Sequence, residues 1–130
     1  MRLVPYTDNF GEKNDCTVRA ASAALGITYH EAYVELARLG RKPNHGFRFH
    51  LVADKFNFTL IRHMIGKYTV GQFCAMHPNG KYVIRTFRHA FVIDRNLIYD
   101  YTKPKKNQRI THVWLVSGEI PTPHEIDIDF

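Results

Sequence analysis

The spacing of hydrophobic positions predicts two helices near the N-terminus. Residues 15–25 are a run of small and apolar residues, with Asp15 at the position of an N-cap and Gly26 as the stop. Residues 28–39 form the second helix, and Gly40 ends it. This helix has hydrophobic positions on one face and capping-box spacing at its start: the face consists of Ala32, Tyr33, Leu36 and Leu39, and the box of Thr28 and Glu31.

Shorter elements follow in the middle of the chain. Residues 47–56 predict a third helix, and residues 58–64, Phe-Thr-Leu-Ile-Arg-His-Met, predict a strand. Capping-box spacing recurs at Thr69, which predicts a fourth helix through about Met76. Pro78-Asn79-Gly80 then predicts a turn.

After this turn the pattern changes from helical to strand-like. Segments rich in β-branched and aromatic residues predict strands at 81–87, 89–94, 96–101 and 111–116. Helices followed by mostly antiparallel strands are typical of an α+β fold, in which the helices pack on one side of a sheet. We therefore expect a single α+β domain at residues 1–118 and a C-terminal tail at residues 119–130.

Composition limits the class of protein. The chain has 130 residues, of which 45% are hydrophobic, and this suffices for one domain with its own core. The sequence has no run of about eighteen apolar residues, so it predicts no transmembrane helix. Residues 1–13 lack the apolar stretch of a signal peptide, and two cysteines are too few for a disulfide-stapled scaffold. We expect a soluble cytoplasmic protein that does not bind membranes.

The positive charge is unevenly distributed. The net charge is +6, but residues from Glu119 onward include four acidic and no basic residues, so the first 118 residues carry +10. One basic cluster consists of Lys103, Lys105, Lys106 and Arg109, and another of Arg38, Arg41 and Lys42. Such clusters attract polyanions, including nucleic acid, without sequence preference. The alternative is a solvated face, since residues 103–109 include no aromatic residue that could stack on a base.

Cys16 is a candidate nucleophile. A thiol attacks as thiolate, and both the N-terminus of a helix and a nearby imidazolium lower its pKa. Cys16 stands at the predicted helix start, although the neighbouring Asp15 opposes ionisation unless its carboxylate turns away. The alternative is an inert, buried cysteine.

His89 and Asp100 are the candidate partners. A tight turn at residues 95–96 joins the two strands that hold them, and a loop of two or four residues places Phe91 opposite Asp100. His89 and Asp100 are then diagonal neighbours on one face, whereas Asp94 points to the other face as a turn residue. Alternatively, His89 bonds a carbonyl and Asp100 pairs with a lysine of the basic loop.

A cysteine at a helix start, a histidine on a strand and an acid on the next strand form a catalytic arrangement known by its roles. Residues 14–26, Asn-Asp-Cys-Thr-Val-Arg-Ala-Ala-Ser-Ala-Ala-Leu-Gly, and residues 88–101 resemble the papain-like cysteine peptidase superfamily. The likeness is to its compact branch, which includes the bacteriocin-processing peptidase domains of exporters. The same two blocks, about thirty residues, also resemble small proteins of tailed phages.

The resemblance implies a papain-like fold with the Cys16 helix at its centre, and a triad in which Cys16 is the nucleophile, His89 the general base and acid, and Asp100 the orienting acid. The family places a glutamine six residues before the cysteine as an oxyanion donor. This sequence has Phe10 there, which leaves Asn9 and Asn14 as candidate donors.

The remaining reactive residues have simpler interpretations. Cys74 is expected in the core, and His45 and His50 in a loop or on a helix surface. Cys16, Cys74 and several histidines could converge on zinc, but no CxxC or HxxxH spacing supports a metal site.

The sequence therefore predicts a cysteine hydrolase, a peptidase or isopeptidase of a peptide or protein that carries acidic residues, with no cofactor. A Cys-His-Asp set also serves acyl transfer and deamidation. The alternative from another class is an inactive protein on the same fold that binds a host protein or nucleic acid through its basic surface. The cytoplasm would be that of the host cell if the chain is phage-encoded.

Overall fold

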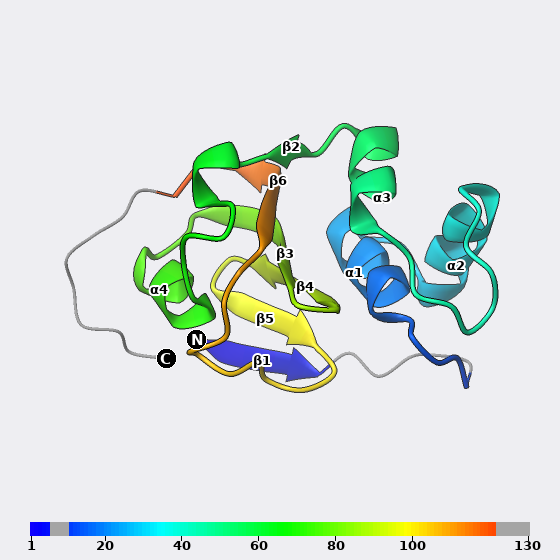
Figure 1. Ribbon diagram of the computed structural model, residues 1–130, viewed down its shortest axis with the longest axis horizontal. Helices are drawn as coiled ribbons and strands as arrows, with labels where there is room; N and C mark the ends of the chain where they lie inside the picture. Colours follow the sequence, from blue (N-terminus) through cyan, green and yellow to red (C-terminus); the bar gives the residue numbers. More distant parts are fainter. Residues whose placement is uncertain (6–10, 122–130) are drawn as a thin grey trace.

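The computed structural model describes residues 1–5 and 11–121 (Figure 1). In these residues four α-helices, one 3-10 helix and six strands are present. The helices are α1 (Cys16–Leu25), α2 (Tyr29–Arg38), α3 (Phe49–Phe56), the 3-10 helix η1 (Arg62–Met64) and α4 (Val70–Ala75). The strands are β1 (Arg2–Pro5), β2 (Thr59–Leu60), β3 (Gly80–Thr86), β4 (His89–Asp94), β5 (Leu97–Asp100) and β6 (His112–Gly118).

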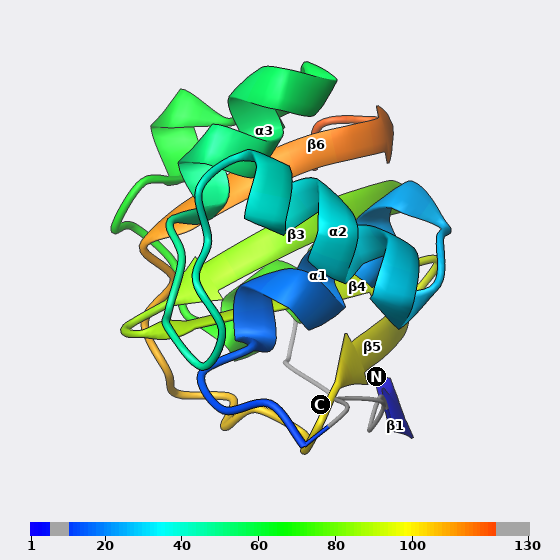
Figure 2. The ribbon, with the colours of Figure 1, turned by 90° about the vertical axis from the view of Figure 1, so that its right-hand side faces the viewer.

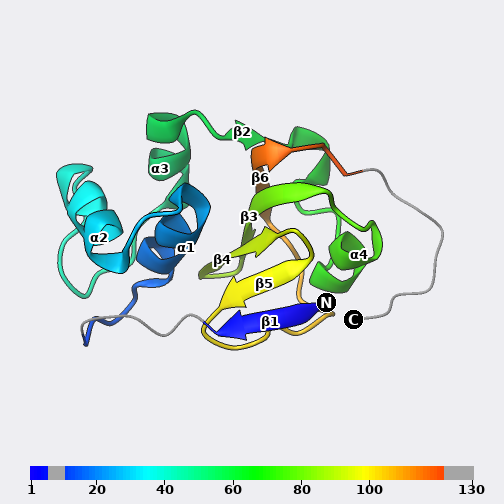
Figure 3. The ribbon, with the colours of Figure 1, turned by 180° about the vertical axis from the view of Figure 1, so that it is seen from behind.

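The strands form one sheet in the order β1-β5-β4-β3-β6-β2. All neighbours pair antiparallel except β1 and β5, which are parallel. Helices α1, α2 and α3 pack on one side of the strands and α4 on the other, as Figure 3 shows from behind. The predicted α+β class and the mostly antiparallel sheet are confirmed, but the expectation that all helices lie on one side was wrong.

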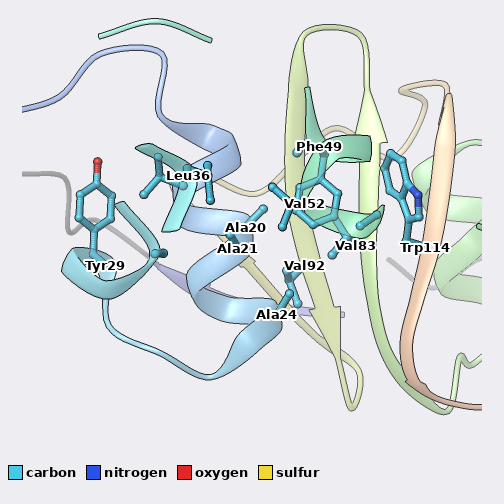
Figure 4. Close-up of a cluster of buried hydrophobic side chains, with 14 residues drawn as sticks. Ala20, Ala21, Ala24, Tyr29, Leu36, Phe49, Val52, Val83, Val92 and Trp114 are labelled. Carbon is cyan, nitrogen blue, oxygen red and sulfur yellow. The ribbon is translucent and has the colours of Figure 1, made fainter. Parts of the chain in front are cut away.

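Helix α1 has the central place in the helical layer. It lies between α2 and the sheet, and α2 is the outermost layer in Figure 2. Half of its buried positions are alanines, with Ala21 fully buried, so neighbouring backbones approach closely (Figure 4). Phe49 of α3 packs on Trp114 of β6 with ring centroids 5.1 Å apart, which closes the core beside α1.

The helix ends largely follow the sequence signals. Gly26 ends α1 in the left-handed region at φ 66°. Both predicted capping boxes are present, at Thr28 with Glu31 and at Thr69 with Gln72. Asp15 precedes α1 as predicted, but its side chain does not cap the helix.

Three local predictions needed correction. The third helix begins at Phe49 instead of residue 47, because Arg48 has extended backbone. The strand predicted at 58–64 is only β2, since the chain turns into η1 and buries Met64. Residues 77–79 have no regular structure, and the reversal before β3 lies at His77, where φ is 50°.

Strand β1 has no counterpart in the sequence-based prediction. It is four residues long, ends in Pro5 and pairs with β5, about 95 residues later in the chain. A short strand that depends on so distant a partner has no local signal beyond its composition.

The predicted tail begins against the domain. The Glu119 N–H donates to the Asn79 carbonyl at 2.9 Å, the Tyr82 hydroxyl donates to the Glu119 carbonyl, and Pro121 is buried. Residues 122–130 lie outside the described residues, so the boundary at residue 119 stays a prediction. In the described part of the chain, no helix has the length and apolar character needed to cross a membrane.

Candidate active site

The β4–β5 hairpin sets the position of the candidate histidine and acid. Arg95 and Asn96 form its two-residue loop, both with positive φ (48° and 64°), as a type I′ turn requires. Val92 pairs with Tyr99 and Asp94 with Leu97, and the next step in this register places Phe91 opposite Asp100. The predicted register is therefore confirmed.

His89 and Asp100 form the contact that this register predicts. His89 Nε2 lies 2.8 Å from Asp100 Oδ2 and 3.0 Å from Oδ1. Asp100 is buried, and its Oδ1 also accepts the Tyr101 N–H at 2.7 Å. The His89 ring stacks on the Phe91 ring, with ring centroids 5.9 Å apart. Asp100 thus binds the imidazole instead of a loop lysine, and both ring and carboxylate are held from two sides.

Asp94 is excluded from this arrangement. Its carboxylate lies 3.5 Å from Arg95 Nε and 4.0 Å from Lys81 Nζ. The same Lys81 ammonium donates to the carbonyls of Ala23 and Ala24 at the C-terminus of α1. Asp94 therefore belongs to a contact that holds the opposite end of the helix, away from the thiol.

Cys16 is the first residue of α1 and is half-buried. Cys16, His89 and Ala90 line one cavity, and against the effect of burial the hydrogen bonds of the thiol with His89 and with the Ala90 N–H lower its pKa. Because His89 Nε2 faces Asp100, the ring nitrogen that remains for the sulfur is Nδ1. The structure therefore brings the predicted cysteine, histidine and acid together as one chain of contacts.

Asp15 does not oppose ionisation of the thiol as its sequence position suggested. The Tyr29 hydroxyl donates to Asp15 Oδ2 at 2.8 Å, and Arg19 Nε lies 3.2 Å from the same oxygen. The carboxylate is buried and compensated on the side of α2. The first turn of α1 itself has no acidic residue, which leaves the positive end of the helix dipole open to Cys16.

The electrostatics of the pair favour the charged forms. Burial by itself raises the pKa of the Cys16 thiol, but the hydrogen bond and charge of His89, together with the Ala90 N–H, outweigh it, so the pKa lies below its ordinary 9.0. The hydrogen bond to Asp100 is the largest cause that raises the pKa of His89, to about 10. Between these two pKa values the pair is a thiolate and an imidazolium.

Cys74 has the opposite environment. It is a buried residue of α4, with its sulfur 3.7 Å from Met1 Sδ, and burial raises its pKa to about 11. The predicted core role of Cys74 is confirmed. The pKa values of the two cysteines are therefore shifted in opposite directions, and Cys74 is a thiol at neutral pH.

A cavity of about 390 Å³ opens at the sulfur, and we call it the thiol cavity. It includes Cys16 and His89, one wall from the segment before α3, and three arginines, one from that segment and two from the β3–β4 hairpin. Its lining residues are Asn14, Cys16, Thr17, Gly46, Phe47, Arg48, Phe49, Arg85, Arg88, His89 and Ala90. The sulfur is therefore accessible to a molecule that enters this cavity.

Of the two candidate oxyanion donors, one is placed at the site. Asn14 lines the thiol cavity, but its Nδ2 already donates to the Asn44 carbonyl at 3.1 Å. Asn9 lies outside the described residues. The N–H groups of the first turn of α1, beginning with that of Cys16, have no acceptor within the helix and point toward its N-terminus, beside the sulfur.

Arg41 is a structural residue of the site that sequence reasoning assigned to a basic surface. Its side chain is only 2% exposed, and its Nη1 lies 2.9 Å from Glu12 Oε1. Its Nη2 also donates to the carbonyls of Lys13 and Asn14, directly before Cys16. The prediction that Arg41 belongs to an exposed basic cluster was therefore wrong. The sequence pattern around Arg41 does not indicate that this side chain is buried.

The basic loop, residues 103–109, lies on the side of His89 that faces away from the thiol cavity. Its backbone is anchored to α4, because the N–H groups of Val70 and Gly71 donate to the Gln108 and Lys106 carbonyls. The Arg109 guanidinium donates to the Lys67 carbonyl at 3.0 Å. Lys103, Lys105 and Lys106 are exposed, and Lys103 and Lys105 line a cavity of about 530 Å³ with His89 and Asp100.

His45 and His50 lie in a loop and on a helix surface, as expected from the sequence. His45 is exposed and its Nδ1 contacts the Pro43 carbonyl, while His50 is exposed on α3. In residues 1–5 and 11–121, no three His, Cys, Asp or Glu side chains gather where they could hold a metal ion.

Asp100→Asn is expected to lower the pKa of His89. The hydrogen bond to Asp100 is the main cause of the raised value, about 10, and an amide supplies neither the negative charge nor the same acceptor strength. The imidazolium should then lose its proton at lower pH. The thiolate of Cys16 should therefore be paired with a positive charge over a narrower pH range. Nuclear magnetic resonance of the His89 ring against pH would measure this shift; an unchanged midpoint would contradict the proposed orienting role.

Comparisons with models of known protein families, with curated proteins and with solved structures found no match for this chain.

Proposed function

We propose that this protein is a cysteine hydrolase that cleaves an amide or isopeptide bond in a peptide or protein. The observation that carries the proposal is the connected set of Cys16, His89 and Asp100 at the thiol cavity. A thiolate that is paired with an imidazolium, which a buried acid orients, is suited to nucleophilic attack on an acyl carbon. The resemblance to papain-like cysteine peptidases supports the same assignment.

Acylation is the first half of the reaction. The Cys16 thiolate attacks the carbonyl carbon, a C–S bond forms, and the carbonyl oxygen becomes an oxyanion. The His89 imidazolium then gives its proton to the leaving nitrogen, the C–N bond breaks, and a thioester on Cys16 remains. Asp100 stays ionised and keeps Nε2 of the ring engaged, so that the other nitrogen faces the reacting atoms.

Deacylation restores the starting state. Neutral His89 accepts a proton from water, the hydroxide attacks the thioester carbon, and the C–S bond breaks. The products are a carboxylic acid, which then loses its proton to solvent, and the thiolate–imidazolium pair. Transfer of the acyl group to an amine in place of water uses the same intermediate.

The first turn of α1 supplies the electrostatic stabilisation of the oxyanion in this mechanism. Its N–H groups, which have no acceptor within the helix, and its positive dipole end lie beside the sulfur, where negative charge develops on the carbonyl oxygen. Asn14 is the side chain that can add a second donor, through the N–H that does not bind Asn44. A missing glutamine upstream is thus compatible with an oxyanion site.

Incubation with p-nitrophenyl acetate tests the proposal without knowledge of the natural substrate. We expect acetylation of Cys16, read by mass spectrometry of its tryptic peptide, followed by slow loss of the acetyl group. Cys74 should remain unmodified in the folded protein, because it is buried and its pKa is about 11. No acetyl-Cys16, or acetylation of Cys16 at the same rate in His89→Ala, would contradict the proposal.

The second candidate function is binding of an anionic host protein or nucleic acid through the basic loop. Its supporting observation is the exposure of Lys105 and Lys106 on a loop with anchored backbone. Binding does not need an ionised thiol, so the acetylation experiment separates the two functions. A nucleophilic thiol also requires a reducing compartment, and we place the protein in the cytoplasm, that of the host cell if the chain is phage-encoded.

A further inference from the structure

The thiol cavity continues into a second cavity along α3. This second cavity, of about 520 Å³, shares Arg48, Phe49 and Arg85 with the thiol cavity. Its lining residues are Arg48, Phe49, His50, Asp54, Phe58, Leu60, Arg62, Arg85, His112 and Trp114. Because the two cavities share a boundary, we treat them as one groove that leads from the sulfur to Trp114, and we call it the arginine groove.

The charge of this groove is strongly positive. Arg48, Arg85 and Arg88 line its inner part and Arg62 its outer part, whereas its one lining acid is Asp54. In the described residues, none of these four guanidinium groups forms an ion pair, in contrast to Arg19, Arg38, Arg41 and Arg95. Cations without a carboxylate partner among the described residues are available to a bound anion.

The floor of the outer part is aromatic and apolar. The His112 ring stacks on Trp114 with centroids 5.5 Å apart and an interplanar angle of 14°. Phe49 packs on the same indole, and Phe58 and Leu60 lie beside them along the cavity. Burial and the neighbouring Arg85 lower the pKa of His112, so at neutral pH it adds an uncharged ring to the floor.

We infer that the arginine groove binds an acidic segment of a peptide substrate, with a carboxylate on Arg48 and Arg85 and a bulky apolar side chain over the Trp114 floor. This inference rests on the proposed function, since the groove ends at the thiolate that would attack the adjoining peptide bond. The planar guanidinium group binds a carboxylate through two parallel hydrogen bonds, which gives specificity for acidic side chains.

A peptide fits these residues better than a nucleic acid does. Trp114 and Phe49 are only 4% and 2% exposed, so neither ring offers a free face on which a base could stack. Asp54 would also repel a polyphosphate at the outer end of the groove, whereas a peptide with a single carboxylate near the thiol avoids it. Arg48, Arg85 and the Trp114 floor are therefore the specificity-determining residues.

Alkylation of Cys16 by an anionic and a neutral reagent tests the charge of the groove directly. The ratio of the iodoacetate rate to the iodoacetamide rate should fall at least about threefold in Arg85→Gln and in Arg48→Gln, because each removes one cation near the sulfur. Arg38→Gln removes an exposed arginine that pairs with Glu35 and should leave the ratio unchanged. The exposed Arg48 keeps the test valid if Arg85→Gln does not fold.

Protection of Cys16 tests peptide binding itself. The acetylated and amidated peptide Gln-Glu-Phe-Gln-Gln, which has a single carboxylate, should slow iodoacetamide labelling of the wild-type protein, and this protection should be lost in Arg48→Gln and Arg85→Gln. Equal protection by Gln-Gln-Phe-Gln-Gln, or stronger protection by oligouridylate, would overturn the inference. If p-nitrophenyl acetate acetylates Cys16 but the acidic peptide does not protect it, only the inferred substrate class is overturned. If the peptide protects Cys16 but no acetylation occurs, only the proposed hydrolase function is overturned.

Discussion

His89→Ala is expected to slow acetylation of Cys16 by p-nitrophenyl acetate at neutral pH at least about a hundredfold. The substitution removes the hydrogen bond and the charge that lower the pKa of the thiol, while burial, which raises it, remains. The pKa should then rise above its ordinary 9.0, and little thiolate should be present at neutral pH. The loss is smaller than the ionised fraction alone predicts, since a thiolate of higher pKa is a stronger nucleophile.

The pH dependence separates this result from a change in shape. In His89→Ala the rate should recover at alkaline pH as Cys16 ionises, because the cavity remains open. His45→Ala is the matched control, since His45 is exposed and its ring contacts a backbone carbonyl, that of Pro43. A rate in His89→Ala within about twofold of the wild type would contradict activation of the thiol by this imidazole.

Arg41→Met is expected to lower the melting temperature by roughly 5–15 °C, the largest effect on stability that we predict. Arg41 is buried, and its guanidinium joins Glu12 to the carbonyls of Lys13 and Asn14. Its loss leaves a carboxylate and two carbonyls without this donor, and the segment before Cys16 loses its anchor. Acetylation of Cys16 should slow as well, because the start of α1 is held less firmly.

Arg38→Met is the control for this effect. Arg38 also pairs with a glutamate, Glu35, at 3.0 Å, but its side chain is 71% exposed. Exposed ion pairs contribute little to stability, so its melting temperature should change by less than about 2 °C. If both variants melt at the same temperature as the wild type, Arg41 does not anchor the segment before Cys16.

The parts of the site that local sequence determines were predictable. A two-residue loop at Arg95 and Asn96 fixes the register of β4 and β5, and strand alternation then brings His89 and Asp100 to one face. The extent of α1 likewise follows from its small residues and from Gly26, which ends it. These features depend on neighbours within about a dozen residues, and such neighbours are visible in the sequence.

The features that depend on distant contacts were not predictable in this way. Cys16 and His89 are 73 residues apart, and their contact was expected only from the roles of a catalytic set and from resemblance. Strand β1, the burial of Arg41 and the placement of α4 on the opposite side of the sheet had no local signal. The arginine groove combines residues from α3, η1 and β3, so its charge emerges only when these elements are brought together.

The central claim is that Cys16 and His89 form an ion pair in the pH range between the lowered pKa of the thiol and the raised pKa of the imidazole. The most direct measurement is the ultraviolet absorbance of the thiolate against pH, taken as the difference between the wild type and Cys16→Ala. We predict a step at a pH below 9.0, the ordinary pKa of a thiol, and a second change near 10, where His89 loses its proton. A single step at or above 9.0, or no difference between the two proteins, would contradict the claim.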